Sequence, residues 1–180
     1  MPGGMLGIVI TLVALWALWV ARGKLTVHGL EYLRWEPTAP RWTSAGIGCG
    51  SGAALVFTAL FQRYRVDTLP PFADLWMGIT LGPVIEEFIF RGYLFAFLSA
   101  LLVRWRTPAP GWMTLTVIAA LFALGHMAKP DITPTQVASI FAMGCLYGWL
   151  RLRSGSTVPS TIAHIAYNAV IYGIAALRAL

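Results

Sequence analysis

Charge is scarce in this 180-residue sequence: only 11% of the residues are charged, and Asp and Glu together number seven. A soluble globular domain has roughly 25% charged residues, so the chain has less than half of the usual share. It is also 58% hydrophobic, which is more apolar surface than a soluble fold of this length can enclose. The composition therefore excludes a soluble domain, a disordered chain, a collagen and a coiled coil, and it predicts an integral membrane protein.

Cysteines and clustered basic residues are also scarce. The two cysteines, Cys49 and Cys145, both lie in apolar segments, which excludes a disulfide scaffold. The 13 Lys and Arg residues give a net charge of +6, but they are scattered singly and in pairs. Scattered basic residues set the orientation of membrane helices and bind anionic lipid, whereas a duplex requires a continuous basic patch. We therefore expect the lipid bilayer as a partner and no nucleic acid.

Long apolar runs separated by polar connections predict the architecture. A transmembrane helix takes about 20 residues, so the chain has room for about six. We expect an all-α, polytopic membrane protein whose single domain covers 1–180. Its predicted spans are 5–21, 44–61, 72–105, 112–127, 135–150 and 158–177.

Two of these spans contain residues that predict special packing. Glycines at 46, 48, 50 and 52 form overlapping GxxxG spacings, which let helix backbones approach closely. The third span is too long for one straight helix of ordinary tilt. Because Pro83 lies inside it, we expect a short lead-in helix, a break or kink near Gly82-Pro83, and then a main helix to Leu102.

The charges of the connections predict an orientation. Residues 22–42, 103–111 and 151–157 carry eight Lys and Arg, and the connections on the other side carry four. The positive-inside rule places the more basic side in the cytoplasm. With six spans, both termini would then face outward.

A few polar side chains lie where the pattern predicts membrane-buried helix. They are Glu86, Glu87, Arg91, His164 and Asn168, with His126 at or just inside a helix end. A charge at this depth costs at least about 2.5–3.5 kcal/mol, so such residues need partners and usually mark function. They are the candidate functional residues.

Helical spacing indicates how these side chains pair. Glu87 and Arg91 are four residues apart, in the order that favours an ion pair on one helix face. Glu86 lies about 100° around the helix from Glu87, so one arginine cannot serve both carboxylates. We expect a structural Glu87–Arg91 pair beside a second carboxylate, Glu86, that points elsewhere.

The histidines supply the rest of a possible reaction centre. His164 and Asn168 are four residues apart and share one helix face, and His126 could join them from the preceding span. A carboxylate and an imidazole can together remove a proton from water, while a second His and an Asn amide can donate hydrogen bonds to an oxyanion. These are the parts of a peptidase without a covalent nucleophile. Taken singly, each has a plain alternative: an interfacial histidine, interhelical hydrogen bonds or a structural ion pair.

Three short motifs together resemble those of a known family. PVIEEFIFRGYL at 83–94 resembles the EExxxR motif of the CPBP family, which comprises CAAX proteases and bacteriocin-processing (Abi) enzymes. FALGH at 122–126 is similar to its second motif, FxxxH, and HIAYN at 164–168 is similar to its third, HxxxN. The three follow in family order on separate predicted helices.

The resemblance implies an intramembrane endopeptidase whose catalytic core covers about 72–177. Glu86 and His126 would activate the water, and His164 and Asn168 would stabilise the oxyanion. Glu87 and Arg91 would support the site. A metal-free mechanism is favoured because the zinc motif HExxH is absent. In the zinc-dependent alternative, the ligands would be Glu86, His126 and His164.

The resemblance also implies the surroundings of the reaction. The substrate would be a membrane-associated protein, a leader peptide or a C-terminal tail, and the compact chain suggests a multi-pass protein of a prokaryotic inner or plasma membrane. The functional alternative is a non-proteolytic membrane protein, either an immunity or partner factor or a proton-coupled transporter.

Overall fold

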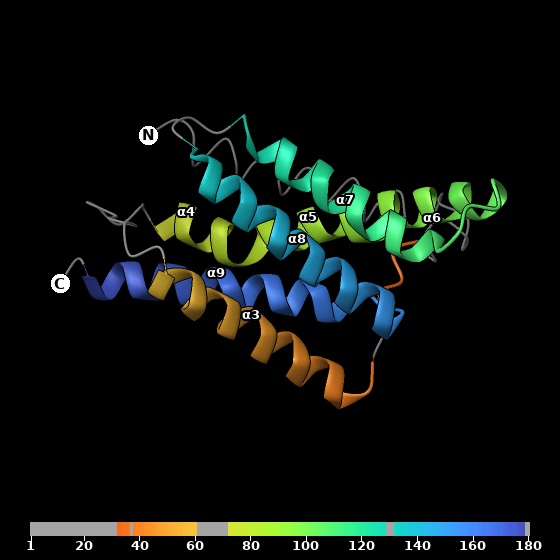
Figure 1. Ribbon diagram of the computed structural model, residues 1–180. Helices are drawn as coiled ribbons and strands as arrows, with labels where there is room; N and C mark the ends of the chain where they lie inside the picture. The colour runs from red at the N-terminus through yellow and green to blue at the C-terminus, as the bar shows by residue number, and fades with distance from the viewer. Residues whose placement is uncertain (1–31, 37, 61–71, 129–131, 179–180) are drawn as a thin grey trace.

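The regular structure that the chain forms is helical. The computed structural model describes residues 32–36, 38–60, 72–128 and 132–178, and no strand occurs in these ranges (Figure 1). The predicted all-α class is therefore confirmed for this part of the protein. The first predicted span, 5–21, lies outside the described residues.

Four long helices lie within a few residues of predicted spans. They are α3 (Pro40–Leu60), α7 (Pro110–His126), α8 (Pro134–Ser154) and α9 (Val158–Arg178). Prolines stand at the first position of α3, α7 and α8, where the missing N–H costs nothing. The start of α8 also has a capping box between Thr133 and Gln136, and Gly155 ends the helix at a left-handed φ of 74°.

Of the predicted break or kink near Gly82-Pro83, a break is not found. Residues 72–104 run on as α4 (Phe72–Trp76), η1 (Met77–Leu81), α5 (Gly82–Glu87), η2 (Phe88–Leu94) and α6 (Phe95–Arg104). The residues at the internal junctions all keep right-handed helical dihedrals. The segments η1 and η2 are π-helical, and such wide turns accommodate residues that disturb the ordinary hydrogen-bond pattern, such as a proline. The helix thus widens before Pro83, and widens again after the paired glutamates.

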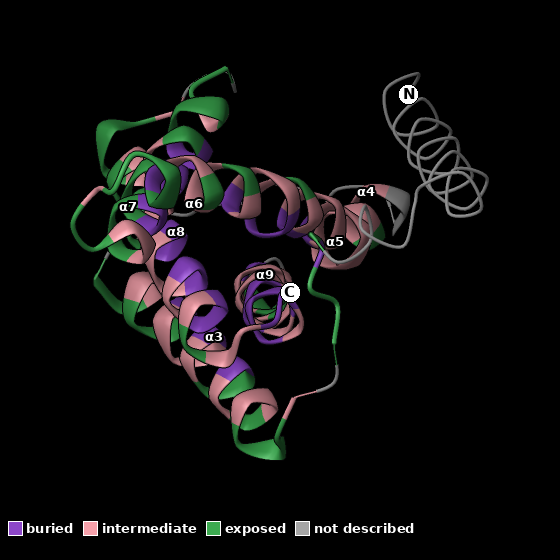
Figure 2. Ribbon diagram, turned by 90° about the vertical axis from the view of Figure 1, so that its right-hand side faces the viewer, coloured by how far each residue is buried: buried purple, intermediate pink, exposed green. Residues whose placement is uncertain are grey.

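Helix α9 lies at the centre of the bundle. It packs against α3, α8, α5 and η1, and Figure 2 shows it end-on among its neighbours. The contact with α3 is very close: a Cβ built on Gly50 would lie 2.1 Å from the carbonyl oxygen of Ala163, and one on Gly46 would lie 2.7 Å from that of Pro159. Only one of the two predicted GxxxG registers is used, because Cβ atoms on Gly48 and Gly52 would meet nothing within 4 Å.

Residues 32–36, part of the predicted connection 22–42, are anchored to the turn before α9. The Thr157 backbone N–H donates to the carbonyl oxygen of Arg34 at 2.9 Å, and the Ser156 hydroxyl donates to that of Glu36 at 2.8 Å. Trp35 also packs edge-on against Phe88 of η2, with ring centroids 4.8 Å apart. The loop therefore fixes the end of the bundle where α9 begins.

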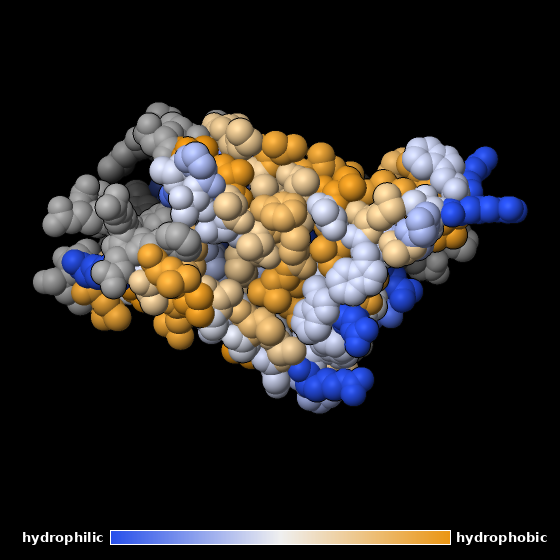
Figure 3. Space-filling view, in the orientation of Figure 1, coloured by the Kyte–Doolittle hydropathy of each residue, from blue (hydrophilic) through white to orange (hydrophobic). Residues whose placement is uncertain are grey.

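The outer surface fits a membrane environment. Two of the described helices, α3 and α9, are long and apolar enough to cross a bilayer, and α7 is a shorter apolar helix. Figure 3 shows hydrophobic side chains over the middle of the bundle and hydrophilic ones at the end where α6 stops and α7 begins. Six spans are predicted from the sequence. In the part of the chain that the structure describes, two helices are long and apolar enough to be membrane spans, so the number six is not shown.

Candidate active site

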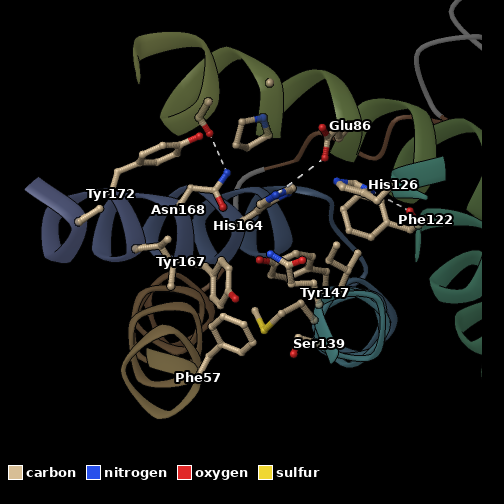
Figure 4. A pocket seen from close by; sticks show the side chains of 18 residues that line it. Phe57, Glu86, Phe122, His126, Ser139, Tyr147, His164, Tyr167, Asn168 and Tyr172 are labelled. Carbon is tan, nitrogen blue, oxygen red and sulfur yellow. Dashed lines mark hydrogen bonds and ion pairs between the residues drawn. The ribbon is translucent and has the colours of Figure 1, made fainter. Parts of the chain in front are cut away.

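A cavity of about 290 Å³ opens between α3, α5, α7, α8 and α9. All four residues predicted to be catalytic line it: Glu86, His126, His164 and Asn168. They come from three helices that are far apart in sequence, and Figure 4 shows their side chains around the same space. The structure therefore brings the predicted residues together, although it does not assign their roles.

Glu87 and Arg91 lie behind the cavity wall. Arg91 Nη1 donates to Glu87 Oε1 at 3.0 Å, and both side chains are fully buried. Arg91 Nη2 also donates to the carbonyl oxygen of Gly144 on α8, at 3.1 Å. The pair therefore has the geometry that its spacing predicts, and it ties the motif helix to α8.

Glu87 has a second contact that the sequence pattern did not predict. Its Oε1 lies 3.2 Å from His164 Nδ1. Because an ionised carboxylate only accepts hydrogen bonds, this geometry assigns the proton to Nδ1. The other ring nitrogen, Nε2, lies 3.9 Å from Glu86 Oε2. Glu87 thus orients the imidazole, as the carboxylate of a catalytic triad orients its histidine, and His164 stands between the two adjacent glutamates.

His126 is oriented by its own helix. Its Nδ1 lies 2.8 Å from the carbonyl oxygen of Phe122, one turn earlier, so Nδ1 is the donor there. A neutral imidazole in this tautomer has its proton-accepting lone pair on Nε2. Figure 4 shows His126 on the same side of the cavity as Glu86. This placement suits the predicted cooperation of these two side chains on one water.

Asn168 has a partner that periodicity alone cannot reveal. Its Nδ2 donates to the carbonyl oxygen of Gly78 in η1 at 2.7 Å. Gly78 is also closely packed, since a Cβ there would lie 2.8 Å from the Tyr172 hydroxyl. One amide hydrogen of Asn168 is therefore used to hold α9 against η1, and the second remains for a ligand.

Arg151 is a supporting residue that the sequence reasoning placed incorrectly. It was expected in a polar connection, as one of the charges that set orientation. It lies instead inside α8, with 7% of its surface exposed. Its Nε donates to the carbonyl oxygen of Arg91 at 3.1 Å, and its guanidinium lies 5.4 Å from the Phe95 ring centroid. A possible signal was its spacing, since it lies one helical turn after Tyr147 on the buried face of α8.

Comparison with family models identifies the chain's relatives. Residues 68–170, more than half of the chain, match the model described as type II CAAX prenyl endopeptidase Rce1-like. The chain belongs to this family. No curated protein and no solved structure matches it. The match covers all three motifs and every residue that was predicted to be catalytic, and it confirms the resemblance drawn from the motifs.

The geometry gives no support to a metal centre. Among the described residues, no three His, Cys, Asp or Glu side chains are grouped closely enough to hold an ion. Glu86, His126 and His164, the ligands of the zinc alternative, all line the cavity. The contact of His164 Nδ1 with Glu87 leaves Nε2 as a possible ligand atom, so this contact does not argue against zinc. The side chains as placed form no ready-made metal site, and the zinc alternative is left to the chelator test.

Proposed function

We propose that this protein is an intramembrane endopeptidase that hydrolyses a peptide bond of a membrane-associated protein, a leader peptide or a C-terminal tail. The observation that carries the proposal is the convergence of Glu86, His126, His164 and Asn168 on one cavity. Membership of the Rce1-like family supports the same reaction class. The protein would be multi-pass, in a prokaryotic inner or plasma membrane, with both termini outward.

In the proposed reaction, Glu86 is the general base. Its side chain is 35% exposed toward the cavity, so a water molecule can reach it. With His126 beside it, Glu86 takes one proton from that water, and the hydroxide adds to the carbonyl carbon of the scissile bond. The tetrahedral intermediate then collapses, the C–N bond breaks, and the departing amine takes the proton from Glu86. No covalent enzyme intermediate and no cofactor is required.

The oxyanion of the intermediate is stabilised from α9. His164 and the second amide hydrogen of Asn168 face the cavity from neighbouring turns of one helix. Because Nδ1 of His164 is directed to Glu87, His164 can donate to the oxyanion only through a protonated Nε2, and the proposal therefore requires the doubly protonated ring. Donors fixed before the reaction stabilise developing charge without a reorganisation cost. Glu87 and Arg91 contribute indirectly, because their buried ion pair holds His164 and joins three helices.

The proposal is tested by comparing the membrane proteome of the native host with and without a Glu86→Gln variant, with sequencing of protein termini. We expect an uncleaved precursor to accumulate in the variant and in His126→Ala and His164→Ala. Asn168→Ala should slow cleavage about 100- to 1,000-fold, the usual effect of losing one oxyanion donor. Glu36→Gln is the matched control, since this exposed carboxylate lies outside the cavity.

Two results would change the account. If no precursor accumulates in Glu86→Gln, the protease proposal is wrong and a partner, immunity or transport role replaces it. Cleavage in vesicles should survive a chelator. Loss of cleavage that zinc restores would replace the glutamate mechanism with a metal-dependent one.

A further inference from the structure

Tyr147 of α8 has a buried hydroxyl that the proposed mechanism does not use. Only 1% of the residue is exposed, and its hydroxyl has no hydrogen-bond partner within the described part of the chain. Burying a hydroxyl without a partner costs roughly 1–3 kcal/mol in proteins. Because most buried polar groups are paired, this one calls for a partner that the described part of the chain does not supply.

Tyr147 forms part of the cavity wall, although its hydroxyl oxygen is itself buried. The residue lines the cavity together with four others on the same face of α8: Gln136, Ser139, Ile140 and Met143. Tyr147 is the last of these along the helix. Helical side chains lean toward the N-terminus of their helix, so its ring extends back toward the open space. Figure 4 shows it on the α8 side of the cavity, next to His164.

Neighbours on α9 and η2 hold the ring. It stacks on the His164 imidazole with centroids 4.7 Å apart and an interplanar angle of 23°. The Arg91 guanidinium carbon lies 5.2 Å from the ring centroid. The side chain that carries the hydroxyl is therefore fixed against His164 and Arg91. A donor held in this way loses little entropy when a ligand binds.

The donors expected for the oxyanion are already partly used. Nδ1 of His164 is directed to Glu87, and one amide hydrogen of Asn168 is directed to Gly78. The cavity wall therefore includes a phenol hydroxyl without a partner among the described residues, next to an oxyanion site whose other donors have internal partners. A neutral phenol is a suitable donor to a developing alkoxide.

We propose that the Tyr147 hydroxyl is a further catalytic donor, which hydrogen-bonds to the carbonyl oxygen of the scissile peptide bond and to the oxyanion formed from it. This inference rests on the proposed peptidase function. Tyr147 transfers no proton in this role. It joins His164 and Asn168 as a third donor, contributed by a different helix.

The test uses the full-length protein in lipid vesicles and the precursor peptide that accumulates in Glu86→Gln. Tyr147→Phe retains the ring and its stacking on His164 but removes the hydroxyl. We expect kcat to fall about 10- to 100-fold, somewhat less than for a sole oxyanion donor, with KM changed less than threefold. Tyr93→Phe is the matched control, because Tyr93 lies outside the cavity lining; its kcat should equal that of the wild type.

The outcomes separate this inference from the proposed function. If the wild type cleaves, Glu86→Gln does not, and Tyr147→Phe retains full kcat, the donor role is wrong while the peptidase stands. A large fall in the melting temperature of Tyr147→Phe would assign the hydroxyl to folding and would also overturn the inference. If the wild type does not cleave the peptide, the proposed function fails and the inference fails with it. A retained melting temperature together with a kcat defect supports it.

Discussion

The two neighbouring glutamates stand in opposite environments. Glu87 belongs to a buried layer with Arg91, Gly144 and Arg151, in which each charged side chain has a hydrogen-bond partner on another residue. Glu86 belongs to a cavity layer with His126, His164 and Asn168. The side chain of Glu87 is fully buried, whereas that of Glu86 is 35% exposed. One step along the helix is a rotation of about 100°, which separates the two environments.

This contrast teaches which layer can carry out chemistry. A buried charge is tolerable only when it is paired and hydrogen-bonded, so the carboxylate of Glu87 is committed to Arg91 and His164. Glu86 approaches His164 only at 3.9 Å and borders open space. His164 belongs to the cavity and contacts both carboxylates, and it therefore links the buried layer to the cavity layer.

The largest expected effect is the loss of the buried charge pair. Arg91→Ala leaves the Glu87 carboxylate buried without its cation, and breaking such a pair costs about 3–5 kcal/mol. It also removes the hydrogen bond to Gly144 on α8. We expect a strongly lowered melting temperature in detergent, measured by circular dichroism. Unchanged stability would show that the buried layer does not hold the bundle together.

A somewhat smaller effect is expected where α9 meets α3. In Gly50→Ala the new methyl group would collide with the Ala163 backbone next to His164. Overpacking of this kind costs about 1–3 kcal/mol, and sometimes more. The matched control is Gly52→Ala, where nothing lies within 4 Å and where alanine favours the helix by up to about 1 kcal/mol. Equal melting temperatures for the two variants would contradict this packing.

A smaller loss is expected from the residue that braces the buried layer. Arg151→Met removes the donor to the carbonyl oxygen of Arg91, a hydrogen bond to a charged group worth about 1.5–3 kcal/mol. Packing against Phe95 would be partly retained, which places the expected cost near the lower end, at about 1.5 kcal/mol. Arg153→Met is the control, because Arg153 is exposed. Denaturant unfolding of both variants should show a loss for the first only.

The sequence predicted the features that depend on spacing within one helix. The i, i+4 distances predicted the Glu87–Arg91 pair and the shared face of His164 and Asn168, and four of the six predicted spans coincide with long helices. It could not give partners on other helices. The Asn168 bond to Gly78 and the Arg151 bond to Arg91 join residues far apart in sequence. These contacts depend on which faces of two helices pack against each other, and the periodicity of a single helix does not predict that packing.

The π-helical turns were missed for a related reason. Pro83 predicted a disturbance of the helix, but a wide turn and a break are both ways to accommodate a proline. The choice depends on the packing of η1 against α9, where Gly78 is in close contact with Tyr172. The role that we propose for Tyr147 could not be predicted either, because a tyrosine in an apolar helix has the pattern of an ordinary core residue. Only the structure shows its hydroxyl without a partner among the described residues.

In the proposed mechanism Glu86 acts as the base and Glu87 holds the supporting ion pair, and these separate roles are tested by comparing Glu86→Gln with Glu87→Gln in the same vesicles. Both substitutions keep the side-chain size. The account predicts that Glu86→Gln lowers kcat at least about 100-fold with an unchanged melting temperature, whereas Glu87→Gln lowers the melting temperature by leaving Arg91 without its anion. Full cleavage by Glu86→Gln, or equal stability losses in both variants, would contradict the account.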